Sequence, residues 1–304
     1  MRVLVAGSAG FLGRRLVAVL KAKGCSVITA DKSDLNDFTG DLSNSEFSAT
    51  LPDVDVVVNC AAVQYVTKSK PLFGWRDFFY KNNVIVVKNL LTRYEGTGVH
   101  FVHVGTSMQY EQNGSHSYNE NSVMASQGVY SWSKLEAQKL IDISKLDVAT
   151  VLPCIIGGRG REGLFAGFIK TIKLFSIAIV PGAGHYPISI VHVDDVALLL
   201  AEIVEKRSVG YYNAAANEVL SINEWAEAVK VKLNAKRLLI FNIPLLPLRI
   251  ISKLLGYKLL AKEQLYMLSM PHALDVSKSM RELNFQPMAP TKIIEDITDY
   301  LVRK

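Results

Sequence analysis

Cysteine is scarce in this sequence of 304 residues. The three cysteines, Cys25, Cys60 and Cys154, lie far apart, and no C-x-x-C pair occurs. An odd number at such spacing argues against a disulfide framework or a cysteine-based zinc site and favours a reducing compartment. The six histidines show no metal-ligand spacing either. We therefore expect no metal, and we interpret each cysteine as a small core residue.

Long uninterrupted apolar runs are also missing. Prolines and basic residues interrupt the most apolar stretch, 238–260, so it lacks the ~20 apolar residues of a membrane-spanning helix. We interpret this stretch as core of a smaller lobe. No signal-peptide pattern precedes the first apolar run at 3–6. These observations predict a cytoplasmic protein without a membrane span.

The sequence shows no dense run of charge of one sign. Its formal net charge is +6, but the basic residues are scattered, which argues against a nucleic-acid-binding protein. A mildly basic surface favours a small anionic ligand instead. The hydrophobic fraction of 49% and the charged fraction of 20% are typical of a globular chain with a sizeable core.

Short apolar runs alternate with helical patterns up to about residue 155. The runs are 2–6, 26–30, 54–59, 100–104 and 148–152, and the helical patterns are 10–23, 82–94 and 129–145. Runs that are continuously apolar indicate strands buried on both faces, as in a parallel sheet covered by helices. The sequence therefore predicts an α/β fold with a doubly wound parallel sheet of the Rossmann type.

Three glycines end the first predicted strand and open the first predicted helix. Gly7, Gly10 and Gly13 form G-x-x-G-x-x-G. Gly7 permits a tight turn, Gly10 lets the backbone approach a pyrophosphate, and Gly13 allows close packing of helix on strand. Free N–H groups and the dipole at the helix start then hold the anion. This pattern predicts a dinucleotide site.

Asp31 ends the second predicted strand, where a carboxylate accepts hydrogen bonds from the ribose hydroxyls of the adenosine. A 2′-phosphate would be repelled there, which favours NAD. Lys32 follows directly and would tolerate that phosphate, so NADP stays open.

The dinucleotide site divides the chain into two expected parts. We expect residues 1–155 to form the dinucleotide-binding Rossmann domain, with 185–206 returning to it. Within that returning segment, Asp195 is expected to cap a helix. Residues 156–184 and 207–304 are expected to form mostly a substrate-binding lobe.

A tyrosine and a lysine one helical turn apart supply acid–base chemistry. Tyr130 and Lys134 share a face of a predicted helix, and Thr106 follows a predicted strand upstream. A phenol titrates near pH 10, but a neighbouring ammonium and a positive nicotinamide ring would lower its pKa. Tyr130 would then exchange a proton with a substrate hydroxyl while a hydride moves to or from the nicotinamide. The Thr106 hydroxyl would hold the reacting oxygen.

These motifs together resemble the extended short-chain dehydrogenase/reductase family, which includes NAD-dependent epimerases and dehydratases and 3β-hydroxysteroid dehydrogenase-like enzymes. The resemblance covers nearly the whole chain. It implies Thr106, Tyr130 and Lys134 as catalytic residues and a homodimer. With the motifs above, it assigns cofactor contacts to Gly7, Gly10, Phe11, Leu12, Gly13, Asp31, Lys32, Asp41, Leu42, Cys60, Ala61, Ala62, Asn83, Tyr130, Lys134 and Pro153.

Departures from the family pattern narrow the substrate. The relatives that eliminate water resemble Thr-Asp-Glu at the hydroxyl site, whereas this chain has Thr106, Ser107 and Met108, which disfavours a dehydratase. Cys154 and Ile188 occupy the places of the Asn and Arg that serve the diphosphate in many epimerases. These changes favour a less charged substrate. The apolar stretch 238–260 lies where 3β-hydroxysteroid dehydrogenase-like relatives line a pocket or touch a membrane, so the resemblance leaves these two roles open beside that of lobe core. Five residues at the carboxyl ends of the predicted strands are expected to contact substrate: Gln64, Tyr65, Ser107, Tyr110 and Cys154.

Three functional hypotheses follow. The first is an NAD(P)-dependent oxidoreductase acting on a secondary alcohol or its ketone. The second is an NAD-dependent nucleotide-sugar epimerase, and the third is a non-catalytic dinucleotide-binding protein. The intact set of Thr106, Tyr130 and Lys134 disfavours the third.

Overall fold

The computed structural model describes residues 1–304 except 34, 66, 68–70, 72, 116, 162–163, 256–260 and 304. Apolar runs in the first half form the central strands. Seven strands make one parallel sheet in the order β11-β6-β5-β4-β1-β2-β3. Their bounds are β1 Arg2–Ala6, β2 Ser26–Asp31, β3 Phe38–Thr39, β4 Val56–Asn59, β5 His100–Val104, β6 Asp147–Pro153 and β11 Gly210–Ala214. The predicted doubly wound fold is confirmed.

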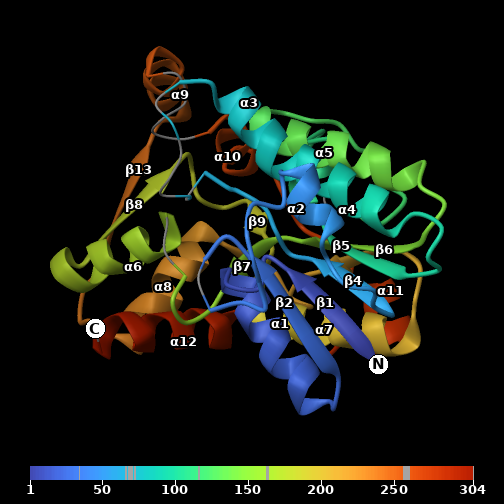
Figure 1. Ribbon diagram of the computed structural model, residues 1–304. Helices are drawn as coiled ribbons and strands as arrows, with labels where there is room; N and C mark the ends of the chain where they lie inside the picture. Colours follow the sequence, from blue (N-terminus) through green and yellow to red (C-terminus); the bar gives the residue numbers. More distant parts are fainter. Residues whose placement is uncertain are drawn as a thin grey trace.

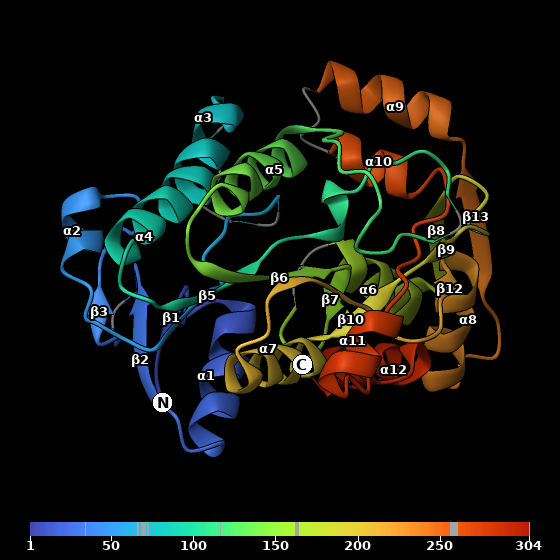
Figure 2. The ribbon, with the colours of Figure 1, turned by 90° about the vertical axis from the view of Figure 1, so that its right-hand side faces the viewer.

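Helices cover both faces of this sheet (Figures 1 and 2). One face packs on α1 Phe11–Ala22 and α7 Val193–Lys206. The other packs on α4 Val86–Tyr94 and α5 Val129–Asp142, with α2 Ser45–Ala49 at its side. The strand order reverses between β1 and β4, so their carboxyl ends open a crevice where ligands bind in such sheets.

A π-helical segment precedes α4. Following α3 Trp75–Phe79, η1 spans Tyr80–Ile85 and runs directly into α4. The sequence predicted a helical pattern from residue 82 without this feature, because the extra residue in a π turn leaves no mark in apolar spacing. The segment carries Asn82 and Asn83, whose side chains are used below.

The second part of the molecule has its own core and three small two-stranded sheets. Its elements are β7 Ile155–Gly157, α6 Leu164–Phe175, β8 Ile177–Pro181, β9 Pro187–Ile188, β10 Ile190–His192, β12 Leu220–Ser221, α8 Ile222–Lys232, β13 Leu239–Ile243, α9 Leu245–Leu254, α10 Lys262–Met267 and α12 Pro290–Arg303. Among the described residues, no helix is long and apolar enough to cross a membrane.

The range 207–304, expected to lie mostly in the lobe, also contributes two elements to the sheet domain: β11 extends the main sheet beside β6, and α11 Ser277–Leu283 packs on it. The division into two domains stays a prediction. One expectation is corrected: the side chain of His192, not that of Asp195, caps α7 by accepting from the Asp194 N–H. Asp195 lies in the first turn of α7 and accepts from the Met288 N–H at 2.8 Å. Its carboxylate therefore joins two chain segments.

Candidate active site

The glycine turn lies at the carboxyl end of β1 with the geometry that its sequence predicts. Gly7 has φ +78°, and a Cβ there would lie 2.5 Å from the Ala61 nitrogen. A Cβ on Gly13 would collide with the Gly7 carbonyl. Gly10 begins α1 without a side-chain cap, and no acidic residue occupies the first turn. The N–H groups at the start of α1 therefore suit an anion such as a pyrophosphate.

Asp31 brings its carboxylate to this turn. Its Oδ2 accepts from the Ala9 N–H at 3.1 Å, and its Oδ1 accepts from the Ser33 N–H at 3.2 Å. The residue ends β2, next to β1, so a ribose beside the glycine turn would meet this carboxylate.

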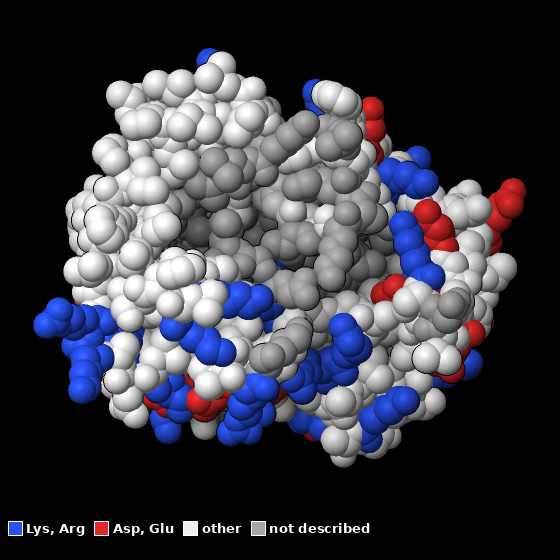
Figure 3. Space-filling view, turned by 90° about the vertical axis from the view of Figure 1, so that its left-hand side faces the viewer, with Lys and Arg blue, Asp and Glu red and all other residues white. Residues whose placement is uncertain are grey.

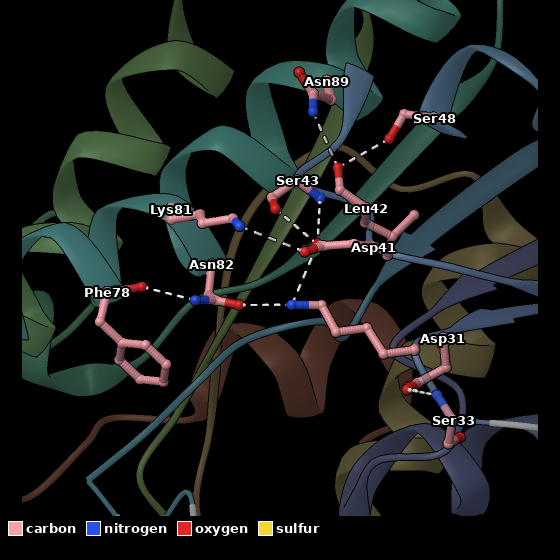
Figure 4. A network of polar contacts seen from close by, with 11 residues as sticks. Asp31, Ser33, Asp41, Leu42, Ser43, Ser48, Phe78, Lys81, Asn82 and Asn89 are labelled. Atoms are coloured by element: carbon pink, nitrogen blue, oxygen red, sulfur yellow. Dashed lines mark hydrogen bonds and ion pairs between the residues drawn. The ribbon is translucent and has the colours of Figure 1, made fainter. Parts of the chain in front are cut away.

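Lys32 belongs to a polar network beyond Asp31 (Figure 4). Its ammonium donates to Asn82 Oδ1 at 2.9 Å and lies 3.2 Å from an Asp41 oxygen. Burial raises the pKa of Asp41, but hydrogen bonds from Ser43 and the charge of Lys32 lower it overall. Asp41 and Asn82 therefore hold the Lys32 ammonium within this network. The Leu42 carbonyl accepts from Asn89 and Ser48, which fixes the loop.

Tyr130 and Lys134 point from α5 towards the carboxyl ends of the strands. Both side chains are buried. The side chains of Thr106 and Gln64 lie next to the Tyr130 phenol and lower its pKa. Lys134 Nζ donates to the carbonyl of Val104, the last residue of β5, at 2.6 Å. The structure thus brings Thr106 to Tyr130 and places Lys134 at the end of the strand that precedes Thr106.

The expected direction of the Tyr130 pKa is wrong for the protein chain alone. Burial raises this pKa to about 12, against the lowering effects of the Thr106 hydrogen bond and the Arg161 charge. Burial also lowers the pKa of Lys134 to about 8. Desolvation outweighs the neighbouring charges because both groups are enclosed. Tyr130 is therefore protonated near neutral pH and is ready to donate.

Sequence reasoning missed Arg161. Its Nη2 donates to Gln64 Oε1 at 2.7 Å, and its guanidinium lies 5.3 Å from the centre of the Phe11 ring. Arg161 thus joins the loop after β7 to the start of α1 and to the Gln64 side chain that contacts Tyr130. The residue lies in a glycine-rich loop, and nothing in its local pattern distinguished it from a solvated arginine.

Sequence reasoning also missed Glu263 on α10. This buried carboxylate accepts from the Ser131 N–H at 3.0 Å and from the Tyr65 hydroxyl at 2.7 Å. It reaches the first turn of α5, where a negative charge is stabilised by the helix dipole. A Cβ on Gly128 would collide with it, so that glycine makes room for the contact. The lobe therefore holds the first turn of the helix that carries Tyr130.

With this geometry in view, comparisons with known proteins identify the family. A family model described as the NAD dependent epimerase/dehydratase family matches residues 3–215. The chain belongs to this family.

Two curated proteins are distantly similar to this chain in sequence. The spore coat polysaccharide biosynthesis protein SpsK of Bacillus subtilis is 26% identical over 169 residues, which cover 56% of this chain and 58% of SpsK. The uncharacterized protein y4nG of Sinorhizobium fredii is 25% identical over 297 residues, covering 93% of this chain and 74% of y4nG.

Solved structures share the fold across the whole chain. UDP-glucose 4-epimerase of Thermotoga maritima, solved with UDP-glucose, is 19% identical with a TM-score of 0.81, covering 100% of this chain and 99% of its own. UDP-glucuronic acid 4-epimerase of Bacillus cereus, solved with NAD, is 20% identical with a TM-score of 0.79 and the same coverage. At sequence identities of 19% and 20%, the structural similarity shows a shared fold.

Three expected substrate contacts are buried within the protein. The Ser107 hydroxyl pairs with His272 Nε2 at 2.8 Å, and the Tyr110 hydroxyl donates to Asn213 at 2.8 Å. Cys154 lies in the main core, and burial raises the pKa of its thiol. Their contact with substrate stays a prediction. Periodicity had placed them at strand ends without showing which way they point.

Other residues that were expected to contact the cofactor lie either at the ends of strands or in η1. Cys60, Ala61 and Ala62 follow β4, beside the glycine turn, and Pro153 ends β6. Asn83 accepts from the Val63 N–H at 2.8 Å and donates to Ser133 at 2.9 Å. Its amide thus fixes the loop after β4 against α5, a positioning role that the sequence did not distinguish from direct cofactor contact.

Proposed function

We propose that this protein binds NAD and catalyses reversible oxidation of a secondary alcohol on a nucleotide sugar, as an epimerase does. The observation that carries the proposal is the buried Tyr130 phenol, with the side chains of Thr106, Gln64 and Arg161 next to it. Arg161 also contacts Phe11, at the start of the uncapped glycine-rich helix α1. NAD, when bound, supplies the acceptor and donor of the hydride. The relatives solved with UDP-sugars and NAD support this choice.

Each residue has a defined task in this reaction. Tyr130 donates its proton to the carbonyl oxygen when a ketone is reduced and takes the hydroxyl proton when the alcohol is oxidised. The Thr106 side chain lies next to the same phenol, where its hydroxyl orients the reacting oxygen. Positive charge lowers the pKa of Tyr130, and Arg161 contributes part of it. In epimerisation the hydride leaves and returns on opposite faces of one carbon, so no net oxidation occurs.

Arg161 also supports a charged substrate. The sequence placed Ile188 where many epimerases carry an arginine, and it therefore favoured a less charged substrate. Arg161 comes from another loop, binds the Gln64 side chain and supplies a cation next to Tyr130. A guanidinium beside the catalytic phenol suits the phosphate or carboxylate of a nucleotide sugar.

The second candidate is a dehydrogenase that releases the oxidised product and exchanges its cofactor. Incubating the purified protein with UDP-sugars separates the two: an epimerase interconverts sugars without added NAD and without net change in nicotinamide absorbance. A dehydrogenase consumes external NAD stoichiometrically. Formation of neither product with any nucleotide sugar or simple alcohol would contradict the enzyme proposal.

We also propose a cytoplasmic location and a homodimer formed through α4 and α5. The three unpaired cysteines support the first proposal. For the second, α4 and α5 contact each other and leave side chains such as Leu91 and Leu140 only half-buried at the surface. Analytical ultracentrifugation at several concentrations tests the dimer, and a monomer throughout would contradict it.

A further inference from the structure

One segment of the lobe departs from the scattered charge of the rest of the chain. Residues 228–262 contain eight lysines and arginines and no aspartate or glutamate. Within it lie β13 and α9, and we call the part formed by these two elements, residues 239–254, the β13–α9 arm. It was interpreted from sequence as lobe core, but most of its apolar side chains are exposed.

The strand of the arm shows an apolar face to the outside. Among the residues that the structure describes, β13 pairs only with β8, in parallel, and Phe241 lies opposite Ile179 in the register. These two side chains share one face of the small sheet, and both are exposed, as are Leu239 and Ile243. The other face of β8, carrying Ala178 and Val180, is buried in the second core. The outer face has no cover within the described part of the chain.

The helix of the arm, α9, also exposes apolar side chains on one side. Its inward stripe is narrow, with Ser252 buried and Leu245 and Leu248 half-buried. Outside that stripe, Leu246 is 69% exposed and Leu254 is 81% exposed. These two residues lie two turns apart on the same side of α9, with Ile250 between them. In Figure 2, α9 stands at the outer edge of the lobe.

Unneutralised cations accompany this apolar surface. Lys236 and Arg237 precede β13, and Arg249 and Lys253 lie on α9; among the described residues, none of the four forms an ion pair with a carboxylate. Arg249 and Lys253, with Lys262, line a surface hollow of about 230 Å³ between α9 and α10. In Figure 3 the upper left of the surface, over β13 and α9, shows no acidic residue.

We propose that the β13–α9 arm docks the protein on a membrane surface rich in anionic phospholipids. Apolar side chains entering the headgroup boundary, with Lys and Arg beside them, are the pattern of a helix that lies in a bilayer interface. A second copy of this chain fits poorly, because a two-fold interface through the arm would bring together two basic surfaces that contain no carboxylate. The inference rests on the arm alone and is independent of the proposed reaction.

Vesicle co-sedimentation tests the docking with the full chain. Vesicles of phosphatidylcholine are compared with vesicles of phosphatidylcholine and phosphatidylglycerol, at low and high salt. We expect binding to the anionic vesicles and its loss at high salt. Leu246→Gln with Leu254→Gln, and separately Arg249→Gln with Lys253→Gln, should each reduce the bound fraction by roughly tenfold.

Matched controls change other exposed residues outside the arm. Leu198→Gln with Val302→Gln, and Lys88→Gln with Lys292→Gln, should bind anionic vesicles as the wild type does. NAD binding and circular dichroism should be unchanged in the arm variants, which separates this proposal from the proposed function. The proposal is overturned by absence of vesicle binding, by equal binding to neutral vesicles, or by equal loss in the controls. It is also overturned if the arm variants convert a dimer into a monomer without any vesicle binding.

Discussion

At the scale of single residues, the site combines groups whose pKa values depend on burial. Tyr130 and Lys134 are one turn apart, yet Lys134 Nζ is held by the Val104 carbonyl. The side chains next to the phenol are instead those of Thr106 and Gln64. Spacing in sequence predicted that the two side chains share a face, and this is confirmed by their common burial at the strand ends. Which groups lie next to the Tyr130 phenol therefore depends on contacts between distant parts of the chain, not on the spacing of Tyr130 and Lys134.

Tyr130→Phe should reduce turnover by about a hundredfold or more, because the variant loses the proton that the reaction exchanges. NAD affinity should be nearly unchanged. Steady-state rates and NAD titration measure the two effects, with Tyr266→Phe on α10 as the matched control. Normal turnover in Tyr130→Phe would remove this residue from the mechanism.

Lys134→Met should change how stability depends on pH. The pKa of Lys134 is about 8 in the folded protein and 10.5 ordinarily, so the unfolded chain binds more protons between these two pH values. The free energy of unfolding of the wild type therefore rises relative to the variant across that window, by roughly 1–3 kcal/mol. Denaturant unfolding at a series of pH values measures this difference, with Lys139→Met as the control. A constant difference would contradict the lowered pKa.

Asp31→Ala should weaken NAD binding more than NADP binding, because the variant loses a ribose acceptor and also the repulsion of a 2′-phosphate. The two dissociation constants measure this ratio. Asp53→Ala, which changes an exposed carboxylate away from the turn, should leave the ratio unchanged. Equal weakening of both cofactors would contradict the ribose assignment.

At the scale of elements, the start of α1 depends on contacts between backbone atoms. Gly13 packs on the Gly7 carbonyl, and Gly7 packs on Ala61. Three segments, β1, α1 and the loop after β4, therefore meet without side chains between them. The motif was readable from sequence because this close approach excludes every residue with a Cβ.

Gly13→Ala should weaken NAD binding and destabilise the protein, since the new Cβ meets backbone that cannot yield. Gly167→Ala is the matched control: nothing lies within 4 Å of its Cβ on α6. There the lost flexibility of the unfolded chain should stabilise the protein by about 0.5–1 kcal/mol. Thermal unfolding and NAD titration measure both variants. Wild-type behaviour of Gly13→Ala would show that the turn can rearrange.

At the scale of the whole molecule, Glu263 connects the lobe to the catalytic helix. Its carboxylate binds the first turn of α5 and the Tyr65 hydroxyl, and the Tyr65 ring packs edge-on against Tyr130 at 5.8 Å. Movement of α10 would therefore move Tyr130. The negative charge also raises the pKa of that phenol.

Glu263→Ala should lower the free energy of unfolding by about 1–3 kcal/mol, because it leaves the buried Ser131 N–H without an acceptor. Glu263→Gln keeps an oxygen acceptor and should cost less. Removing the charge lowers the pKa of Tyr130, so the limb of the pH–rate profile set by Tyr130 should move to lower pH in Glu263→Gln. Glu227→Gln, on the exposed side of α8, is the control. An unshifted pH–rate profile would show that Glu263 has only a structural role.

The sequence by itself determined the parallel sheet and the glycine turn, and it predicted roles for Asp31 and for Thr106, Tyr130 and Lys134. Each of these is local: a continuous apolar run, a spacing of three or four residues, or a residue at a strand end. Such patterns fix backbone conformation before any distant contact forms.

Only the tertiary structure decided the neighbours of those residues. Ser131 and Glu263 are 132 positions apart, Gln64 and Arg161 are 97 apart, and Ser107 turned to His272 across 165. It also decided that the β13–α9 arm lies outside the core. Such pairings depend on how packed layers bring buried polar groups together, and burial is a property of the whole fold that no local spacing encodes.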